Sequence, residues 1–252
     1  MSTDNYPMIT VVMPNYNGAR FIEQSIDSVL AQTYSNYEFI IVDDCSTDNS
    51  PELILRKASE DSRIRVIEKD DNTGVADTRN IGIRKARGSY IALIDSDDLW
   101  TPDKLERQLA LSEKSDIVYC SYDFIDEENN TVKKPFIVPE KTTFKRMLSS
   151  NEIGCSTSFV KAKLMKEHPF NPDYYHEDYV LWMELLKECE CAYGDPEVLV
   201  HYRIVKGSRS DNKRNAAKER WTAYRKALNL SIPASASAFV RYAVNGIIKH
   251  HF

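Results

Sequence analysis

The sequence has no long apolar run. No stretch approaches the about 18 uninterrupted apolar residues of a membrane-spanning helix. The first residues, MSTDNYPMITVV, lack both a basic start and a long apolar core, so no secretory signal peptide is expected there. The five cysteines form an odd set without a CxxC pair, which indicates neither a disulfide framework nor a zinc site. Reduced thiols in a cytoplasmic protein are therefore expected.

Charge is unevenly distributed along the 252 residues, whose net value is -5. Residues 206–252 contain ten Lys or Arg and two Asp or Glu, which gives +8 and leaves -13 for the preceding 205 residues. An acidic body is not expected to bind nucleic acid. The basic tail, in contrast, suits an anionic surface.

The first hundred residues alternate between short β-rich runs and helical periodicity. Strands are expected at 9–13, 38–42, 64–68 and 90–94, with helices at about 21–30, 46–58 and 77–86, the second capped by Ser46 or Asp48. This alternation predicts βαβ units and a largely parallel sheet. Continuous apolar strands such as FIIV and YIALI predict that helices cover both faces.

The second half is less regular. It predicts helices at 105–111 and 179–186, strands at 117–120, 156–160 and 197–202, and a hairpin tip at 126–130. Two amphipathic helices are expected in the tail, at about 214–228 and 236–250. Their aromatic residues fit either packing on the main domain or contact with a membrane surface.

Polar clusters follow three of the predicted strands: PNYN after the first, DDCS after the second and DSDD after the fourth. In open α/β sheets, ligands bind beyond the carboxyl ends of the strands, so these clusters should meet at one edge. Within DSDD, Asp95 and Asp97 have the D-x-D spacing of a hard-cation site that also takes substrate phosphates. The alternative is a solvated turn in which Asp98 or Thr101 caps the next helix.

Four further candidates have equally plain alternatives. Asp44, in the pair Asp43-Asp44, suits a nucleobase N–H or a ribose hydroxyl, or else a helix cap. Arg79 suits a phosphate, or else a surface salt bridge. Glu177-Asp178 suits a general base, or else the acidic preference of a helix N-terminus. The flexible cations of a basic loop would close on a diphosphate or simply face water; they are Arg203, Lys206 and Arg209.

Taken together, four stretches resemble the family 2 inverting glycosyltransferases with the GT-A fold, over roughly residues 8–210. They are TVVMPNYNGARFIEQSIDSVLAQTY, EFIIVDDCSTDNS, NTGVADTRNIGIRKARGSYIALIDSDDLW and HEDYVLW. The resemblance implies an α/β fold, with a Rossmann-like, mostly parallel sheet flanked by helices and a C-terminal helical extension. It divides the chain into a nucleotide-sugar-binding half (1–98), an acceptor-binding half (99–205) and a basic helical tail (206–252).

The same resemblance assigns roles to individual residues. Pro14 and Tyr16 would line the nucleotide pocket, and Asp44 would bond the base. Arg79 would approach the base or the diphosphate, and Lys206 would assist electrostatically. Asp95 would lie near the ribose and the metal, Asp97 would ligate the metal, Asp178 would be the catalytic base, and Glu177 would contact the acceptor. Val205 stands where many relatives have a histidine, which puts any role of that histidine in doubt.

The implied reaction is a transfer of a sugar from a nucleoside diphosphate, with a UDP-sugar as the expected donor, assisted by Mn²⁺ or Mg²⁺. The acceptor would be a hydroxyl of a saccharide or lipid-linked saccharide, and the product a bacterial surface polysaccharide such as capsule, O-antigen or teichuronic acid. The expected location is the cytoplasm, with the tail at the inner face of the membrane. Two rival classes remain: a sugar-phosphate nucleotidyltransferase and a non-catalytic nucleotide-sugar-binding protein.

Overall fold

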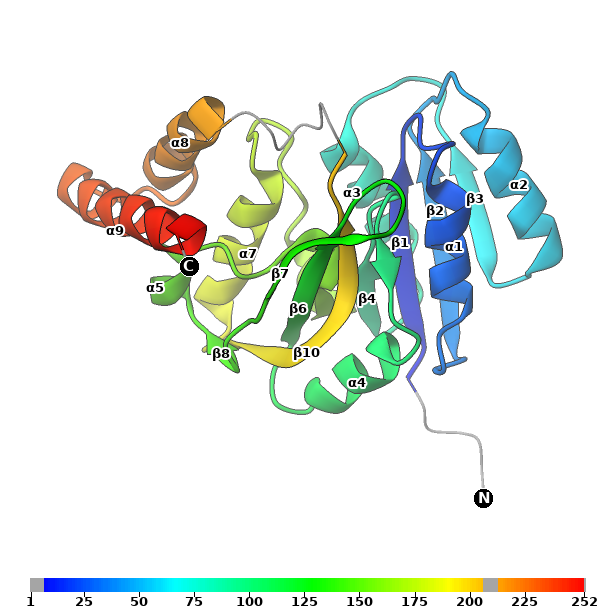
Figure 1. Ribbon diagram of the computed structural model, residues 1–252, viewed down its shortest axis with the longest axis horizontal. Coiled ribbons are helices and arrows are strands. Elements are labelled where there is room, and N and C mark those ends of the chain that lie inside the picture. The colour runs from blue at the N-terminus through cyan, green and yellow to red at the C-terminus, as the bar shows by residue number, and fades with distance from the viewer. Residues whose placement is uncertain (1–6, 206–212, 252) are drawn as a thin grey trace.

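In the part of the chain that the computed structural model describes, ten β-strands form one mixed sheet with helices on both faces (Figure 1). The structure describes residues 7–205 and 213–251, and their side chains except those of 213–216 and 245–251. The strands are β1 (Ile9–Asn15), β2 (Tyr37–Asp43), β3 (Ile64–Glu68), β4 (Tyr90–Leu93), β5 (Leu99–Trp100), β6 (Ile117–Ile125), β7 (Thr131–Phe136), β8 (Lys141–Thr142), β9 (Phe159–Lys161) and β10 (Ala192–Arg203).

Helices connect these strands and extend the chain beyond the last of them. They are α1 (Ile22–Leu30), α2 (Ser50–Glu60), α3 (Val75–Lys85), α4 (Lys104–Leu111), α5 (Phe144–Met147), the short η1 (Cys155–Thr157), α6 (Ala162–Glu167), α7 (Glu177–Glu188), α8 (Lys213–Thr222), the π-helical turn η3 (Ala223–Ala227) and α9 (Ile232–His251). Helices α8 and α9 lie at the opposite end of the molecule from α2 and β3 (Figure 1).

The strand order is β3-β2-β1-β4-β9-β6-β10-β5, with β7 paired to β6 and β8 to β10. Strands β3, β2, β1 and β4 are mutually parallel. Strand β9 is antiparallel to both β4 and β6, so β6 and its parallel partner β10 run in the same direction as β4. The expected α/β fold with a mostly parallel central sheet is confirmed, and strands from both sides of residue 98 share it.

Side chains of the central strands alternate between two hydrophobic clusters, one on each face. Val12 of β1 packs in the cluster with α3, α6 and α7, whereas Val11 and Met13 pack in the cluster with α1, α2 and α4. A strand that is apolar at every position can therefore bury alternate side chains in the two clusters, one on each face of the sheet. Loops at the carboxyl ends of the strands are left to carry polar groups.

Two local predictions need correction. Residues 156 and 157, expected in a strand, lie in η1, because the hydroxyls of Thr157 and Ser158 donate to the nearby carbonyls of Gly154 and Cys155 and favour a turn over a strand ladder. The helix expected to be capped by Ser46 or Asp48 begins at residue 50, after Asn49. The hydroxyl of Ser46 donates to Asp43 instead, whereas Asp48 accepts the N–H of Ser50, the first residue of α2, at 2.9 Å and the N–H of Ala19 in the loop after β1.

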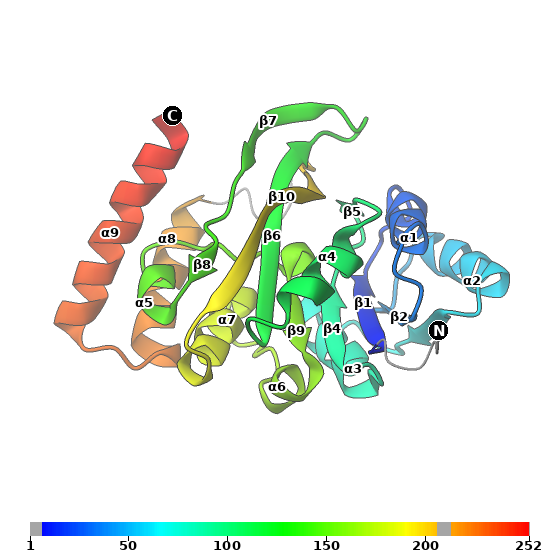
Figure 2. The same cartoon turned by 90° about the horizontal axis from the view of Figure 1, so that it is seen from below.

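The C-terminal helices pack against the main domain. Ala223, Tyr224 and Leu228 are buried in the α3–α6–α7 cluster, and the Tyr224 hydroxyl donates to the carbonyl of Leu148. Figure 2 shows α9 along the outer edge of the molecule, beyond α5 and α8. The part of α9 with described side chains leaves several apolar residues exposed, namely Ile232 (63%), Val240 (61%) and Val244 (49%). Within residues 7–205 and 213–251, no helix is both long and apolar enough to cross a membrane.

Candidate functional site

The loops after β1 and β2 are tied together by Asn15 and Asp43. The Asn15 side-chain amide donates to Asp43 Oδ1 at 2.6 Å and to Ser50 Oγ at 2.9 Å. Asp43 also accepts the backbone N–H of Ser46 at 2.9 Å. This carboxylate thus organises the turn after β2 and caps neither α2 nor any other helix. The first member of the acidic pair is a structural residue.

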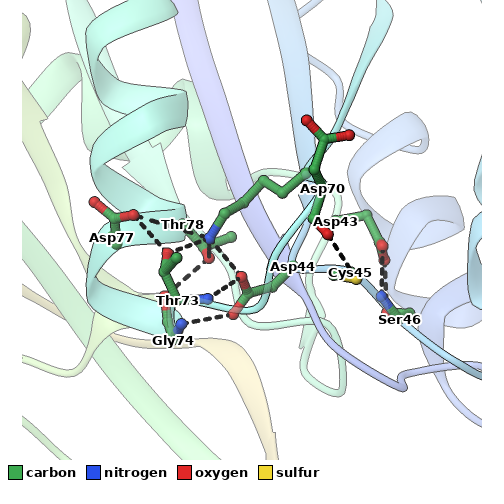
Figure 3. Close-up of polar contacts among 10 residues, drawn as sticks. Asp43, Asp44, Cys45, Ser46, Asp70, Thr73, Gly74, Asp77 and Thr78 are labelled. Carbon is green, nitrogen blue, oxygen red and sulfur yellow. Dashed lines mark hydrogen bonds and ion pairs between the residues drawn. The ribbon is translucent and has the colours of Figure 1, made fainter.

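The Asp44 carboxylate is surrounded by hydrogen-bond donors at the N-terminus of α3 (Figure 3). Its carboxylate accepts the backbone N–H groups of Thr73 at 3.0 Å and Gly74 at 2.9 Å, as well as the Lys69 ammonium. Burial raises the pKa of Asp44, but these donors outweigh it and hold the pKa below the usual value. Three donors leave one of the four acceptor positions of the carboxylate for a ligand. Asp44 therefore does not cap α2, the helix that follows it, and bonds N–H groups at the start of α3 instead.

Tyr16 and Pro14 lie differently in the β1 loop. Tyr16 is 52% exposed, so its ring is accessible to a ligand. Pro14 is buried in β1, opposite Val42 of β2. Pairing of β1 with β4 ends at Val12, so the missing N–H of Pro14 costs no ladder bond on that side. Tyr16 is the member of this pair that presents its side chain.

DSDD forms a tight turn in which Asp98 is buried. The Asp98 N–H donates to the carbonyl of Asp95 at 3.1 Å. The Asp98 carboxylate accepts the Ser156 hydroxyl at 2.5 Å and the Arg203 N–H at 2.9 Å. Asp98 therefore does not cap α4, whose N-cap is Asp103. Burial, followed by the charges of the two neighbouring aspartates, raises its pKa well above the usual value.

Arg203 is not a flexible cation. It is 2% exposed, and its guanidinium donates to the carbonyl of Asp97 at 2.8 Å, to the carbonyl of Asp126 at 2.9 Å and to Gln24 Oε1 at 3.1 Å. These bonds fix the acidic turn against the β6–β7 hairpin. The other two cations expected in this loop, Lys206 and Arg209, lie outside the described residues.

Arg79 joins the acidic turn to the start of α7. This buried guanidinium bonds Asp95 at 2.6 Å and Glu177 at 3.1 Å, and it lies over the ring of Phe170. Its Nε–H is buried without a hydrogen-bond partner. Burial lowers the pKa of the Arg79 guanidinium. The charges of Asp95, and then of Cys155 and Glu177, raise that pKa by more than burial lowers it, so Arg79 stays positively charged. The alternative of a surface salt bridge is wrong.

Asp97 carries charge that the protein does not neutralise. Burial, followed by the neighbouring Asp95, raises the pKa of Asp97 to about 6 despite Arg203 and Arg79. No group of three or more His, Cys, Asp or Glu that would bind a metal alone occurs in the described part of the chain. Asp97, which has no ion pair with another described side chain, and the neighbouring Asp95, which Arg79 pairs, supply the oxygen ligands that suit a hard cation completed by a bound diphosphate. The donor set thus agrees with Mn²⁺ or Mg²⁺.

Asp178 lies in the first turn of α7, beside Glu177. Its Oδ1 accepts the N–H of Tyr179 at 2.7 Å. Burial raises the pKa of Asp178 above its usual value, although the Tyr179 N–H and the charges of Arg79 and Arg220 oppose that change. A half-buried carboxylate of raised basicity is suited to accept a proton from a hydroxyl.

Residues 10–167 match the family model described as Glycosyl transferase family 2. The chain belongs to this family. It is 36% identical over 245 residues to TuaG of Bacillus subtilis, named for glycosyl transfer in teichuronic acid biosynthesis, with 96% of this chain and 97% of TuaG covered. It is 34% identical over 257 residues to WfgD of Escherichia coli, a UDP-Glc:alpha-D-GlcNAc-diphosphoundecaprenol beta-1,3-glucosyltransferase, with 99% and 97% covered.

Among solved structures, the mannosyltransferase PcManGT of Pyrobaculum calidifontis, in complex with GDP-Man and Mn²⁺, superposes with a TM-score of 0.73. It is 21% identical and covers 96% of this chain and 74% of its own. The GT-A fold and the activity class of this family 2 glycosyltransferase are thereby confirmed.

The structure brings together several site residues of this family 2 chain and adds others. Arg79, Asp95 and Glu177 are directly bonded, while Asp44 and Tyr16 lie on the β1–β2 side. Sequence reasoning missed three residues: Lys69, Ser156 and Arg220. Lys69 directly follows β3, so the rule on carboxyl ends of strands could have found it. The other two come from a 3₁₀ turn and from the basic tail, where no local pattern marks them.

Proposed function

We propose that the protein transfers a sugar from a nucleoside diphosphate, a UDP-sugar, to a hydroxyl of a saccharide or lipid-linked saccharide during bacterial surface polysaccharide synthesis. The observation that carries this proposal is the bonded chain Asp95–Arg79–Glu177, which links the acidic turn to the turn that bears Asp178. The names of WfgD and TuaG support the donor base, the lipid-linked acceptor and the polysaccharide product.

The donor half, residues 1–98, supplies the nucleotide contacts. Tyr16 stacks on the base, as an exposed aromatic ring is suited to do. Asp44 accepts an N–H of the base at its remaining acceptor position. Asp95 lies on the ribose side, and the buried positive charge of Arg79 attracts the diphosphate. Pro14 supports the loop from within the sheet, and Lys206 adds positive charge.

Asp97 and Asp95 would hold a divalent cation, Mn²⁺ or Mg²⁺. When bound, such a cation stabilises the negative charge that develops on the leaving diphosphate. The complex of PcManGT with Mn²⁺ supports this choice. The structural contribution of the chain is the turn itself, which Arg203 and Ser156 keep fixed.

Asp178, in the acceptor half of residues 99–205, removes the proton of the acceptor hydroxyl. As the proton moves to the carboxylate, the oxygen bonds to the anomeric carbon from the face opposite the diphosphate. The bond from that carbon to the diphosphate oxygen breaks, and the diphosphate leaves with the electron pair. A single displacement inverts the anomeric centre, as it does in inverting glycosidases. Glu177, held by Arg79, contacts the acceptor.

The test is Asp178→Asn, assayed for sugar transfer and for donor binding. Removing a general base costs about 10²- to 10⁴-fold in rate, so transfer should fall by that much. The rise in melting temperature caused by the donor with Mn²⁺ should persist. Glu184→Gln, a half-buried carboxylate later in α7, serves as the control and should retain transfer. Full transfer by the Asp178 variant would refute the assignment of the base.

The same assay separates the rival classes. A nucleotidyltransferase would form a sugar nucleotide from a nucleoside triphosphate and a sugar phosphate, whereas this protein should not. A non-catalytic binding protein would show the donor-dependent rise in melting temperature without any transfer. The single glycine in PNYNGARF provides no Gly-rich phosphate loop of the kind that a nucleotidyltransferase needs.

The basic tail is proposed to hold this cytoplasmic enzyme at the inner face of the membrane. Support comes from the exposed side chains of Ile232, Val240 and Val244 and from the +8 charge of residues 206–252. Val240→Ser/Val244→Ser should reduce sedimentation with anionic vesicles, while Val132→Ser, an equally exposed valine in β7, should not. Equal sedimentation of both variants and the parent would contradict this location.

A further inference from the structure

Arg220 is an unusual cation in the last turn of α8. Only 4% of the residue is exposed. Its guanidinium carbon lies 3.5 Å from the ring centroid of Tyr179 in α7 and 4.5 Å from that of Tyr242 in α9. Both Nε and Nη1 are buried without a hydrogen-bond partner. Three helices thus meet around a single positive charge.

This arrangement is costly for a residue that only fills space. Within the described residues, no ion pair joins Arg220 to a carboxylate, and a buried charge without such a pair carries a desolvation penalty. Cation–π contacts of about 0.5–2 kcal/mol each offset part of that penalty. A methionine of similar length would pack between the same rings without it. The charge itself therefore needs a reason.

Asp178 supplies that reason. Tyr179, whose ring Arg220 covers, directly follows Asp178 and donates its N–H to that carboxylate at 2.7 Å. The charge of Arg220 also lowers the pKa of Asp178, against the effect of burial. Arg79 faces the same carboxylate but is engaged by Asp95 and Glu177. Arg220 has no carboxylate of its own among the described residues.

Other ionisable groups also surround Asp178. Asp95 follows β4, the Cys155 thiol lies in η1, and His176 and Glu177 precede Asp178 in its own segment. The carboxylate Asp95 raises the pKa of Asp178, as does burial. Only Arg79 and Arg220, among the described side chains named here, lower it by their charge.

We propose that Arg220 is a positioning residue, supplied by the C-terminal helices, whose fixed charge keeps Asp178 in its proton-accepting form. The rings of Tyr179 and Tyr242, between which the Arg220 guanidinium lies, hold that charge in place and fix the first turn of α7. The tail thereby completes the acceptor side of the site. This inference rests on the proposed role of Asp178 as the base.

The experiment compares the pH profiles of kcat for Arg220→Met, Arg220→Lys and the parent, all as full chains. In Arg220→Met, the acidic limb of the kcat profile should move to higher pH by about one unit. At a pH on that limb, kcat should be about tenfold lower than in the parent, and it should recover at higher pH. Arg220→Lys should keep the limb close to its original position. The KM for the donor should not change. Lys218→Met, which removes an exposed charge from the same helix, should behave like the parent.

Several results would overturn the inference. One is an Arg220→Met variant whose kcat falls equally at every pH; another is one whose profile coincides with that of the parent. If Arg220→Met does not fold, Tyr242→Leu tests the same idea, because it removes one of the two rings that hold the Arg220 guanidinium. This variant should shift the acidic limb to higher pH by less than the shift expected for Arg220→Met. An unmoved limb in that folded variant would overturn the inference. Transfer that survives in Asp178→Asn would instead refute the proposed base, independently of Arg220.

Discussion

Lys104, the first residue of α4, should make the stability of the protein depend on pH. The residue is fully buried, with its ammonium 2.6 Å from Gln108 Oε1 and 3.8 Å from the ring centroid of Trp100. Burial lowers the pKa of Lys104 from 10.5 to about 8. Because the folded-state pKa lies below the unfolded one, the unfolded state binds more protons between pH 8 and 10.5, and stability rises across that window.

The magnitude follows from the shift. One pKa unit corresponds to about 1.4 kcal/mol, so the charged side chain costs roughly 3 kcal/mol below pH 8. Most of that cost, about 2 kcal/mol, disappears by pH 10. The perturbation is Lys104→Met, which removes the titrating group. Relative to this variant, the parent should gain about 2 kcal/mol in its free energy of unfolding between pH 7 and pH 10.

Urea unfolding at both pH values measures this difference between the parent and Lys104→Met. Groups that titrate in alkali without interacting with Lys104, such as the buried Tyr119, contribute equally to both proteins and cancel. The Cys120 thiol, whose pKa the charge of Lys104 lowers, does not cancel, so both proteins are compared in a Cys120→Ala background. Lys187→Met, which removes an exposed lysine of α7, provides the matched control and should track the parent at both pH values. A difference between the parent and Lys104→Met that is the same at pH 7 and pH 10 would refute the reasoning.

Three other substitutions test the site and its support. Asp97→Asn should raise the melting temperature of the metal-free protein at pH 7, because the raised pKa of Asp97 shows that the fold disfavours its charged form. The same substitution should abolish the effect of Mn²⁺ on donor binding. A lower melting temperature of the metal-free variant would contradict this reasoning. Tyr16→Ala should weaken donor binding in calorimetry by about 1–3 kcal/mol if the ring stacks on the base, and unchanged affinity would argue against stacking. Gly82→Ala should cost about 1–3 kcal/mol in urea unfolding, because its Cβ would lie 2.4 Å from Val12 Cγ1 and displace the helix that carries Arg79; full stability would show that α3 shifts freely.

The donor side of the site was predictable because its signals are local. Apolar runs marked β1, β2 and β4, and the rule on carboxyl ends placed the polar residues that follow them at one edge. The clusters that contain Asp44 and Asp97 were placed in this way, and the resemblance to family 2 then singled out these two residues. Neither needed knowledge of which distant segment lies beside it.

The partners of Asp98 and Arg203 were not predictable in the same way. Asp98 bonds Ser156, 58 residues away, and the N–H of Arg203, 105 residues away. The first contact depends on the antiparallel pairing of β9 with β4, and the second on the antiparallel pairing of β5 with β10. No local sequence pattern predicts either pairing. A basic residue at the end of a strand has the same appearance in sequence whether it faces water or three carbonyl and amide oxygens.

Arg79 is shared between the acidic turn after β4 and the first residue of α7. One nitrogen of its guanidinium bonds Asp95 on the donor side, and another bonds Glu177 on the acceptor side. A change that weakens the bond between Arg79 and Asp95 alters the bond between Arg79 and Glu177. By thermodynamic reciprocity, a change at Glu177 alters the bond between Arg79 and Asp95. The acidic turn and the start of α7 are therefore mechanically connected through one side chain.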